Sequence, residues 1–143
     1  MGKKTSGIFL ISNNKLLLVH PTNGGNKWSI PKGLVEDSDE SILDAGIREL
    51  KEETCFDLML YPNIIPEYLG TSDYKTQNKT LYGFKYLFSS DVTNDFKLKC
   101  NSTFIDNSGK NILENDIIKW VYLSDISKYN LHPTQIELLK TII

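Results

Sequence analysis

The stretch that most constrains the fold is ESILDAGIRELKEET, residues 40–54. Its apolar residues Leu43, Ile47 and Leu50 are spaced by four and three positions, which is the period of an α-helix with one apolar stripe. Acidic residues just before it suit the positive end of a helix dipole. Such a helix must bury its stripe against other elements. The rest of the chain therefore has to supply a surface on which it can pack.

Strand patterns lie on both sides of this helix and predict that the surface is a sheet. Residues 5–20 are typical of a hairpin with a turn at Asn13 and Asn14. Further strands are expected at 63–76, 80–90 and 117–123, a strand pair or long loop at 89–115, and a closing helix at 132–143. The order of strands, helix, strands and helix predicts a layered α/β or α+β domain with a mixed sheet. At 143 residues, we expect one domain over residues 1–143.

The composition limits the binding partners and the cellular compartment that we expect for this protein. The net charge of −2 provides no global basic field, so nucleic acid is an unlikely partner, and a phosphate-rich ligand needs a specific site or a bound cation. Cys55 and Cys100 have no metal-type spacing and favour free thiols in a reducing compartment. The apolar run at residues 8–11 is too short for a signal sequence or a membrane span. We expect a cytoplasmic protein without a membrane partner.

The helix carries a dense group of carboxylates. At 100° per residue, Glu49, Glu52 and Glu53 point within roughly a 100° sector beside the apolar stripe, while Lys51 points away. Their mutual repulsion amounts to about a few kcal/mol at an effective dielectric constant near 20. Protonation of one carboxylate or binding of a cation would relieve it. Oxygen-only ligands favour Mg²⁺ or Mn²⁺. On the helix alone, a solvated face and a cation site both stay open.

The segment from Gly33 to Phe56 resembles the Nudix box. That pattern is Gly, five residues, Glu, seven residues, Arg-Glu, an aliphatic residue, any residue, Glu-Glu, any residue, Gly and an aliphatic residue. The matching positions are held by Gly33, Glu40, Arg48, Glu49, Leu50, Glu52 and Glu53. Two departures stand out. Six residues instead of five separate Gly33 from Glu40, and Cys55 stands where the box has the glycine that normally caps the helix.

The resemblance implies a Nudix-like mixed sheet sandwiched between helices, and an activity. Nudix enzymes are pyrophosphohydrolases that use Mg²⁺ or Mn²⁺ to cleave a nucleoside diphosphate linked to another moiety. It implies metal-binding roles for Glu52, Glu53 and the carbonyl of Gly33, and a role as metal ligand or general base for Glu49. It further implies that Arg48 orients a glutamate and that Glu40 steadies the junction of loop and helix.

Fewer candidate site residues lie outside the box. In this family a late loop sometimes supplies the base, and the polar segment before the last predicted strand offers Glu114, also a candidate for substrate binding, and Asp116. Lys32 is either a phosphate contact or a plain surface lysine, and packing is favoured over base stacking for Trp28. Candidates to line the cleft are Tyr74 and Lys85, whereas His20 and His132 are expected to be structural or solvated.

Several functions remain open at this stage. A small-molecule nucleotide substrate is favoured, either a dinucleoside polyphosphate or a (d)NTP, followed by a 5′-RNA end or a nucleotide sugar. A non-catalytic Nudix domain for ligand sensing is an alternative, but such domains typically lose box carboxylates, and this chain keeps all four. A structural domain with a fortuitous acidic face is the third possibility. The sequence predicts nothing about oligomeric state.

Overall fold

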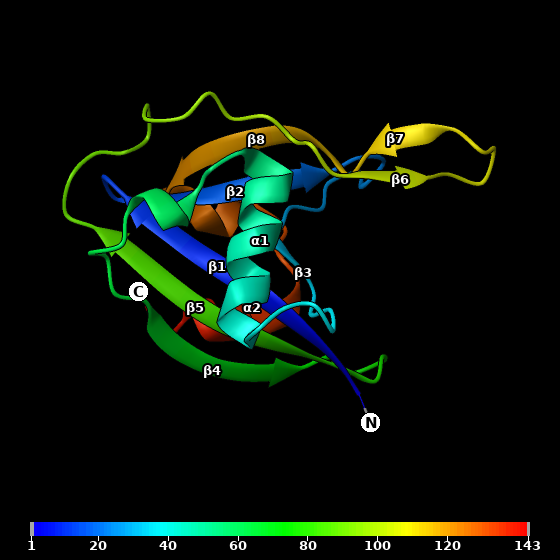
Figure 1. Cartoon of the computed structure of the whole chain (residues 1–143), viewed down its shortest axis with the longest axis horizontal. Helices are drawn as coiled ribbons and strands as arrows, with labels where there is room; N and C mark the ends of the chain where they lie inside the picture. Colours follow the sequence, from blue (N-terminus) through cyan, green and yellow to red (C-terminus); the bar gives the residue numbers. More distant parts are fainter. Residues whose placement is uncertain (1, 143) are drawn as a thin grey trace.

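The computed structural model describes residues 2–142 and places a mixed sheet between helices, as expected (Figure 1). The strands are β1 (Lys3–Ser12), β2 (Lys15–Pro21), β3 (Lys32–Leu34), β4 (Glu67–Asp73), β5 (Lys79–Phe88), β6 (Thr103–Ile105), β7 (Asn111–Leu113) and β8 (Asn115–Tyr122). The helices are α1 (Ile42–Thr54), α2 (Pro133–Leu139) and the short 3₁₀ segments η1 (Leu58–Leu60) and η2 (Leu123–Lys128). Within the described residues, no helix is long and apolar enough to cross a membrane.

Strand β1 lies at the centre of the main sheet, whose order is β4-β5-β1-β2-β8. It runs parallel to β5 and antiparallel to β2, and its first half also pairs with β3. Residues 5–12 of β1 are all buried, as expected for a strand covered on both faces. The turn to β2 has positive φ at Asn13 (52°) and Asn14 (59°), which confirms the predicted hairpin.

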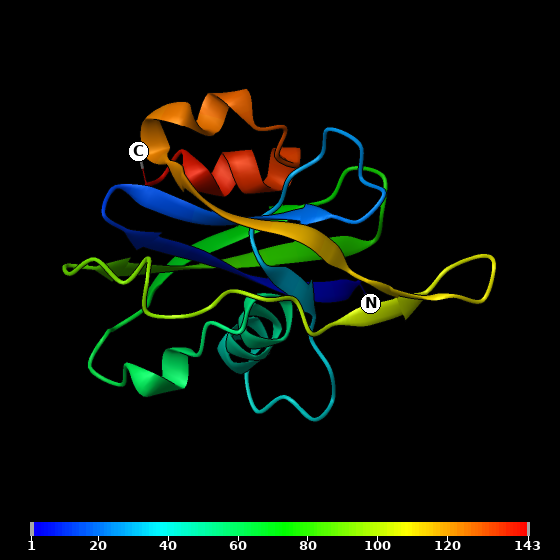
Figure 2. The same cartoon turned by 90° about the horizontal axis from the view of Figure 1, so that it is seen from above.

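The two faces of the sheet support two helical layers (Figure 2). Alternate residues of β1 point to opposite faces. Ile8 and Leu10 belong to the cluster that contains Leu50 of α1. Phe9 belongs to the opposite cluster, together with Leu138 of α2. The apolar stripe of α1 therefore docks on one face of the sheet, while α2 and η2 cover the other.

Some bounds differ from the sequence-based expectation: the closing helix α2 spans Pro133–Leu139 rather than 132–143, and β4 spans Glu67–Asp73 rather than 63–76. Helix α1 begins at Ile42 rather than at residue 40, because the Ser41 hydroxyl accepts a hydrogen bond from the Asp44 N–H at 3.0 Å and caps the helix. Residues 89–115 divide into an irregular stretch and the hairpin β6–β7, which pairs with itself and projects from the body (Figures 1 and 2).

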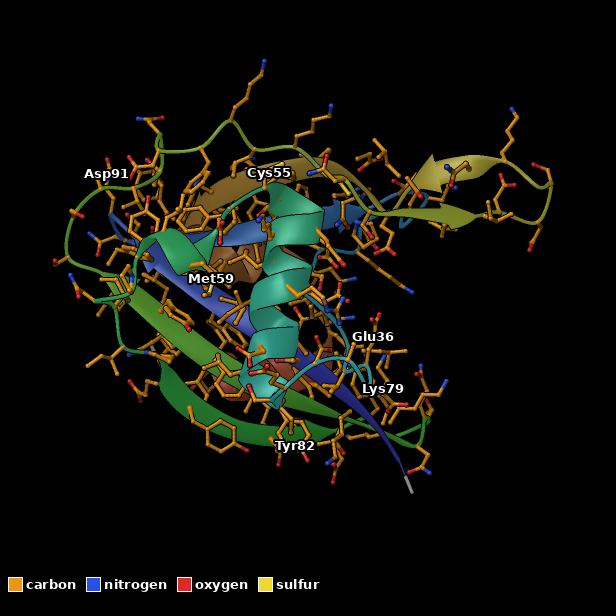
Figure 3. The ribbon with its side chains drawn as sticks, viewed as in Figure 1. Glu36, Cys55, Met59, Lys79, Tyr82 and Asp91 are labelled. Atoms are coloured by element: carbon orange, nitrogen blue, oxygen red, sulfur yellow. The ribbon has the colours of Figure 1, made fainter. Side chains whose placement is uncertain are left out.

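Helix α1 ends at a residue with an unusual backbone. Cys55, at the end of the α1 ribbon in Figure 3, has φ 69°, the left-handed conformation that glycine usually supplies at this position. Its thiol donates a hydrogen bond to the Lys99 carbonyl at 3.1 Å and accepts one from the Asn101 amide at 2.8 Å. The backbone N–H groups of Lys99 and Asn101 also bond the carbonyls of Thr54 and Glu52. A distant segment therefore completes the end of the helix.

Candidate functional site

Two of the three clustered glutamates are buried. Glu49 and Glu53 lie one turn apart on α1, and they are only 9% and 5% exposed. The Glu52 side chain, on the flank of the helix, is 42% exposed. Charged residues are almost never fully buried without a partner. A simply solvated helix face is therefore the wrong interpretation for Glu49 and Glu53.

The backbone of β3 lies directly against these two carboxylates. A Cβ atom at Gly33 would lie 2.0 Å from Cδ of Glu49, so only glycine allows this close approach. Pairing of Gly33 with Ser6 of β1 holds it in register with the sheet. The N–H of the preceding residue, Lys32, points to Oε1 of Glu53 at 3.4 Å. The structure thus brings together three members of the predicted metal set, Gly33, Glu49 and Glu53.

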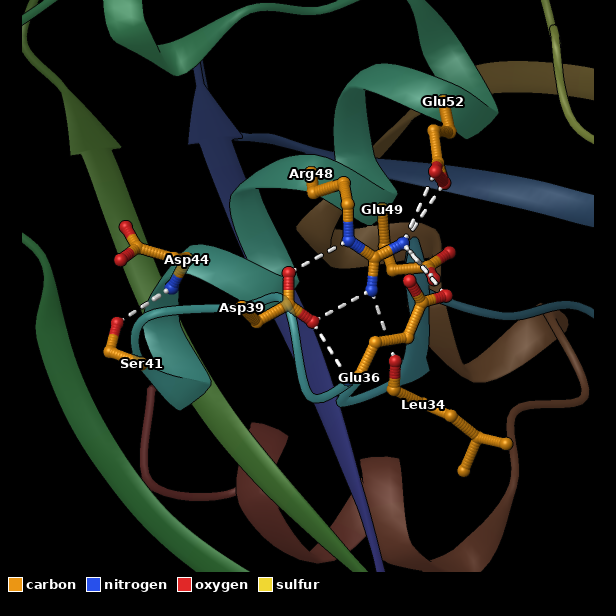
Figure 4. A network of polar contacts seen from close by, with 8 residues as sticks. All are labelled: Leu34, Glu36, Asp39, Ser41, Asp44, Arg48, Glu49 and Glu52. Atoms are coloured by element: carbon orange, nitrogen blue, oxygen red, sulfur yellow. Dashed lines mark hydrogen bonds and ion pairs between the residues drawn. The ribbon is translucent and has the colours of Figure 1, made fainter.

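Arg48 organises the acidic residues around it (Figure 4). Its Nε and Nη2 donate to the two carboxylate oxygens of Asp39 at 2.9 and 3.0 Å. Its Nη1 donates to Glu49 at 2.9 Å and to both oxygens of Glu52 at 3.1 Å. Hydrogen bonds from Arg48 hold the pKa of Asp39 below its usual value, and Asp39 in turn raises the pKa of Arg48. The predicted orienting role of Arg48 fits this geometry.

The position predicted for Glu40 needs correction. Glu40 is exposed, and within residues 2–142 its side chain makes no hydrogen bond or ion pair. Asp39 instead holds Arg48, with a side chain only 6% exposed. Five residues separate Gly33 from Asp39, which is the spacing of the box, so the extra residue lies between this acid and Arg48. The late start of α1 at Ile42 leaves Asp39 in the preceding loop, where it can reach the guanidinium.

The buried carboxylates hold their protons unusually tightly. Burial raises the pKa of Glu49 to about 7, despite the opposing charge of Arg48. Burial also raises the pKa of Glu53 well above its usual value, and the charge of Glu49 adds to the rise. The charge of Glu114 raises both pKa values further. Burial therefore outweighs the nearby positive charges of Arg48 and Lys32, which act to lower these pKa values.

These donors fit a hard divalent cation in their chemistry. Buried carboxylates with raised pKa values favour either protonation or a bound cation, and oxygen donors select Mg²⁺ or Mn²⁺. As the side chains lie, no three His, Cys, Asp or Glu residues among residues 2–142 are close enough together to form a metal-binding group. Glu52, the remaining member of the predicted set, contacts Arg48 instead. Its role as a metal ligand stays a prediction.

A cleft of ≈ 610 Å³ opens beside the carboxylates. Glu53 and Glu114 contribute acidic groups to its wall, and Lys32, the predicted phosphate contact, also lines it. Its aromatic lining comes from Trp28, Tyr74 and Phe104. The cleft thus joins the acidic site to a surface that suits a nucleotide, with rings for apolar contact and polar groups for orientation.

Trp28 lines the cleft and also packs against neighbouring rings. It lies edge-on to His20 and to Tyr129, each with ring centroids 5.1 Å apart. The predicted packing role is therefore confirmed, and one side of the residue still borders the cleft. His20 is structural, as expected, because it pairs with Asp116 at 2.6 Å. Asp116 is thus bonded to His20, and it is not among the residues that line the cleft.

One expectation about the cleft lining was wrong, since Lys85 pairs with Glu67 at 3.0 Å and does not border the cleft. His132 has the expected structural role, because its ring accepts a hydrogen bond from the Thr134 N–H and caps α2, and it also borders the cleft. Sequence reasoning also missed Lys27 and Lys79. Their one signal is that Lys27 ends the Gly- and Asn-rich stretch PTNGGNK and that Lys79 follows Asn78, both of which are typical of turns.

Comparison with known proteins finds a protein family whose model matches this chain. The model for the NUDIX domain matches residues 2–142. An uncharacterized 17.7 kDa protein in the e-segB intergenic region of Enterobacteria phage T4 is 33% identical over 140 residues, which cover 89% of this chain and 91% of the phage protein. The m7GpppN-mRNA hydrolase of Saccharomyces cerevisiae is 32% identical over 94 residues, which cover 66% of this chain and only 9% of the yeast protein.

Solved structures show the same fold. One is a bifunctional NMN adenylyltransferase/ADP ribose pyrophosphatase from Francisella tularensis, complexed with AMP and a Mn ion. It superposes with a TM-score of 0.70 at 19% identity, and the match covers 99% of this chain and 41% of that one. At this level of identity the likeness concerns the fold alone.

Proposed function

The chain belongs to the Nudix hydrolase family, and we propose that this hydrolase of phosphoanhydride bonds is a Mg²⁺-dependent pyrophosphohydrolase. Its substrate is a nucleoside diphosphate linked to another moiety, first of all a dinucleoside polyphosphate or a (d)NTP. The observation that carries this proposal is the buried pair Glu49 and Glu53, with Gly33 against Glu49 and with Glu53 on the wall of a large cleft. Burial raises the pKa of both carboxylates even though Arg48 bonds Glu49, an arrangement that a purely structural helix does not need.

The proposed roles follow from the contacts. Glu49, Glu53 and the carbonyl of Gly33 would hold Mg²⁺ or Mn²⁺, with Glu52 as a further donor. When bound, the cation neutralises the pyrophosphate and lowers the pKa of water. Arg48 fixes the directions of Glu49 and Glu52 through its Nη1. The solved Francisella tularensis relative with AMP and a Mn ion supports this choice of cofactor.

Glu114 is our candidate for the general base. It borders the cleft together with Glu53, and its charge raises the pKa of both buried glutamates. A positioned carboxylate can take the proton from water as oxygen attacks phosphorus, an effect of about 100-fold or more on rate. Glu49 is the alternative base, because its pKa of about 7 suits proton transfer near neutral pH.

The test compares Glu53→Gln with Glu40→Gln. Both variants replace one carboxylate by an amide, but Glu53 is buried at the site and Glu40 is exposed without polar contacts. With Mg²⁺ and a panel of nucleoside diphosphate derivatives, we expect kcat/KM to fall by about 100-fold or more in E53Q. E40Q should match the wild type. Undiminished hydrolysis by E53Q would show that the metal site is misassigned.

A 5′-RNA end is the second candidate substrate. The similarity to the yeast m7GpppN-mRNA hydrolase favours it, although the net charge of −2 disfavours contact with long RNA. The panel should therefore include a capped RNA, a 5′-triphosphate RNA and a nucleotide sugar. Tight binding of a nucleotide without turnover by the wild type would instead support the non-catalytic sensing domain.

A further inference from the structure

A second group of charged side chains borders the cleft, and this group is basic. Lys27, Lys32 and Lys79 all line it. Within residues 2–142, none of the three forms an ion pair, whereas three lysines elsewhere pair with carboxylates. Most lysines of the described residues lack an ion pair, and what sets Lys32 and Lys79 apart is that both are half-exposed on the wall of a cleft.

The basic groups lie close enough to repel one another. Burial lowers the pKa of Lys79, and the charges of Lys32 and Lys3 lower it further. Burial likewise lowers the pKa of His132, and the charges of Lys32, Lys79 and Lys27 lower it further. Like charges held together lose stability that a bound anion restores. The net charge of the chain is −2, so this positive character is local to the cleft.

An unpartnered buried hydroxyl lies in the same place. Tyr74 is 9% exposed and lines the cleft, and its hydroxyl has no hydrogen-bond partner among the described residues. Its backbone N–H bonds the Lys79 carbonyl at 3.0 Å, and Nζ of Lys79 lies 4.6 Å from the centre of its ring. Buried polar groups normally find a partner. A phosphate oxygen could accept hydrogen bonds from both the hydroxyl and the ammonium group.

We infer that Lys32, Lys79 and the hydroxyl of Tyr74 form a second anion subsite, which takes a phosphate group of the substrate other than the one attacked. Lys27, exposed at the rim, adds positive charge. The assignment to a substrate rests on the proposed function. It favours a nucleoside polyphosphate over a nucleotide sugar, because a chain of three or more phosphates has more charged groups to place at this end of the cleft than a diphosphate has.

The test measures binding of inorganic tripolyphosphate by calorimetry in the presence of EDTA. Lys79→Gln removes a cation of the subsite. The matched control is Lys85→Gln on the same strand, which removes a lysine paired with Glu67 outside the cleft. We expect K79Q to weaken binding about tenfold, the size of one charge-assisted hydrogen bond, while K85Q binds like the wild type. Tyr74→Phe keeps the ring and should weaken binding severalfold.

The outcomes separate this inference from the proposed function. If wild type binds no tripolyphosphate, or if K79Q and Y74F bind it as tightly as wild type, the subsite is refuted. If K79Q does not fold, Y74F and Lys32→Gln decide by the same measurement. The hydrolysis assay on E53Q can fail while this binding result holds, and the reverse is equally visible, because no turnover occurs in the binding experiment.

Discussion

Asp39 and Glu40 are neighbours in the sequence with opposite surroundings. Asp39 is nearly buried and makes two hydrogen bonds to Arg48, and it also accepts one from the Glu36 N–H at 2.8 Å. Glu40 is exposed to solvent. A single acid thus ties the loop after β3 to the helix that carries the buried glutamates.

We expect Asp39→Asn to destabilise the protein by about 2 kcal/mol, because the amide cannot accept both hydrogen bonds from a charged guanidinium. Glu40→Gln should change the free energy of unfolding by less than about 0.5 kcal/mol. Urea unfolding of the two variants at neutral pH checks both values. Equal stabilities would mean that the ion pair between Asp39 and Arg48 contributes nothing to the fold.

The sequence allowed most of the acidic site to be predicted, but not this partner. Glu49 and Glu53 follow from helical geometry, and Gly33 and the role of Arg48 follow from the resemblance to the Nudix box; the structure brings them together. Asp39 and Glu40 are both acidic, so composition cannot decide between them. The choice depends on where the helix begins, and that boundary depends on a cap formed by the Ser41 hydroxyl.

At the scale of elements, the end of α1 joins two parts of the chain. Cys55 holds a left-handed backbone that costs a residue with a Cβ roughly 1–2 kcal/mol. Its thiol meets Lys99 and Asn101 across 44 and 46 positions of sequence. Strain and hydrogen bonding therefore act in opposite directions at this residue.

Comparing Cys55→Gly with Cys55→Ala isolates the strain, since both variants lose the thiol. Glycine adopts the left-handed backbone freely, but it loses about 0.5–1 kcal/mol more chain entropy on folding than alanine does. We expect C55G to be more stable than C55A by about 0.5–1 kcal/mol. Thermal unfolding of the pair measures this difference. A more stable C55A would show that the backbone here relaxes out of the left-handed region.

Elements that pair locally or carry a clear period were predictable, and others were not. The β1–β2 hairpin and helix α1 follow from turn residues and an apolar stripe. Residues 99–101 bond the end of α1 chiefly through backbone groups, which leave no side-chain pattern to read. The hairpin β6–β7 pairs only with itself and has an exposed surface on both strands, so no alternation marks it.

At the scale of the whole molecule, the cleft collects residues that are far apart in the sequence. Lys32 comes from β3, Lys79 from β5, Glu114 from the residue before β8, and His132 from the start of α2. Only the sheet order β4-β5-β1-β2-β8, with β3 beside β1, places them around one space. Sequence patterns identify each strand, but long-range pairing decides which charges meet.

Global stability in the absence of divalent ions should fall as the pH rises. The folded pKa of Glu49 is about 7 against an ordinary value of 4.5, so the folded state binds this proton more tightly than the unfolded state does. Its stabilising effect is complete below about pH 4.5 and is lost as the pH rises toward 7. The change should be of the order of 2 kcal/mol.

Urea unfolding in EDTA at about pH 5 and about pH 8 measures this change, with Glu49→Gln as the reference because it cannot ionise. The pKa of His20, raised by the Gly25 carbonyl and by Asp116, shifts stability in the same direction, but it does so equally in both proteins. Parallel pH profiles for wild type and E49Q would contradict the expectation.

The closure of α1 by residues 99–101 sets the order in which the site can assemble. The box lies within residues 33–56. However, the strand beneath α1, β1, pairs with β5, and the last carbonyls of α1 accept their hydrogen bonds from the N–H groups of Lys99 and Asn101. Such distant pairings form slowly, since long loops must close first. During synthesis, the acidic pair has no finished surroundings until about residue 101 has left the ribosome. A polypeptide stopped just after the box would carry the whole motif and still lack a site.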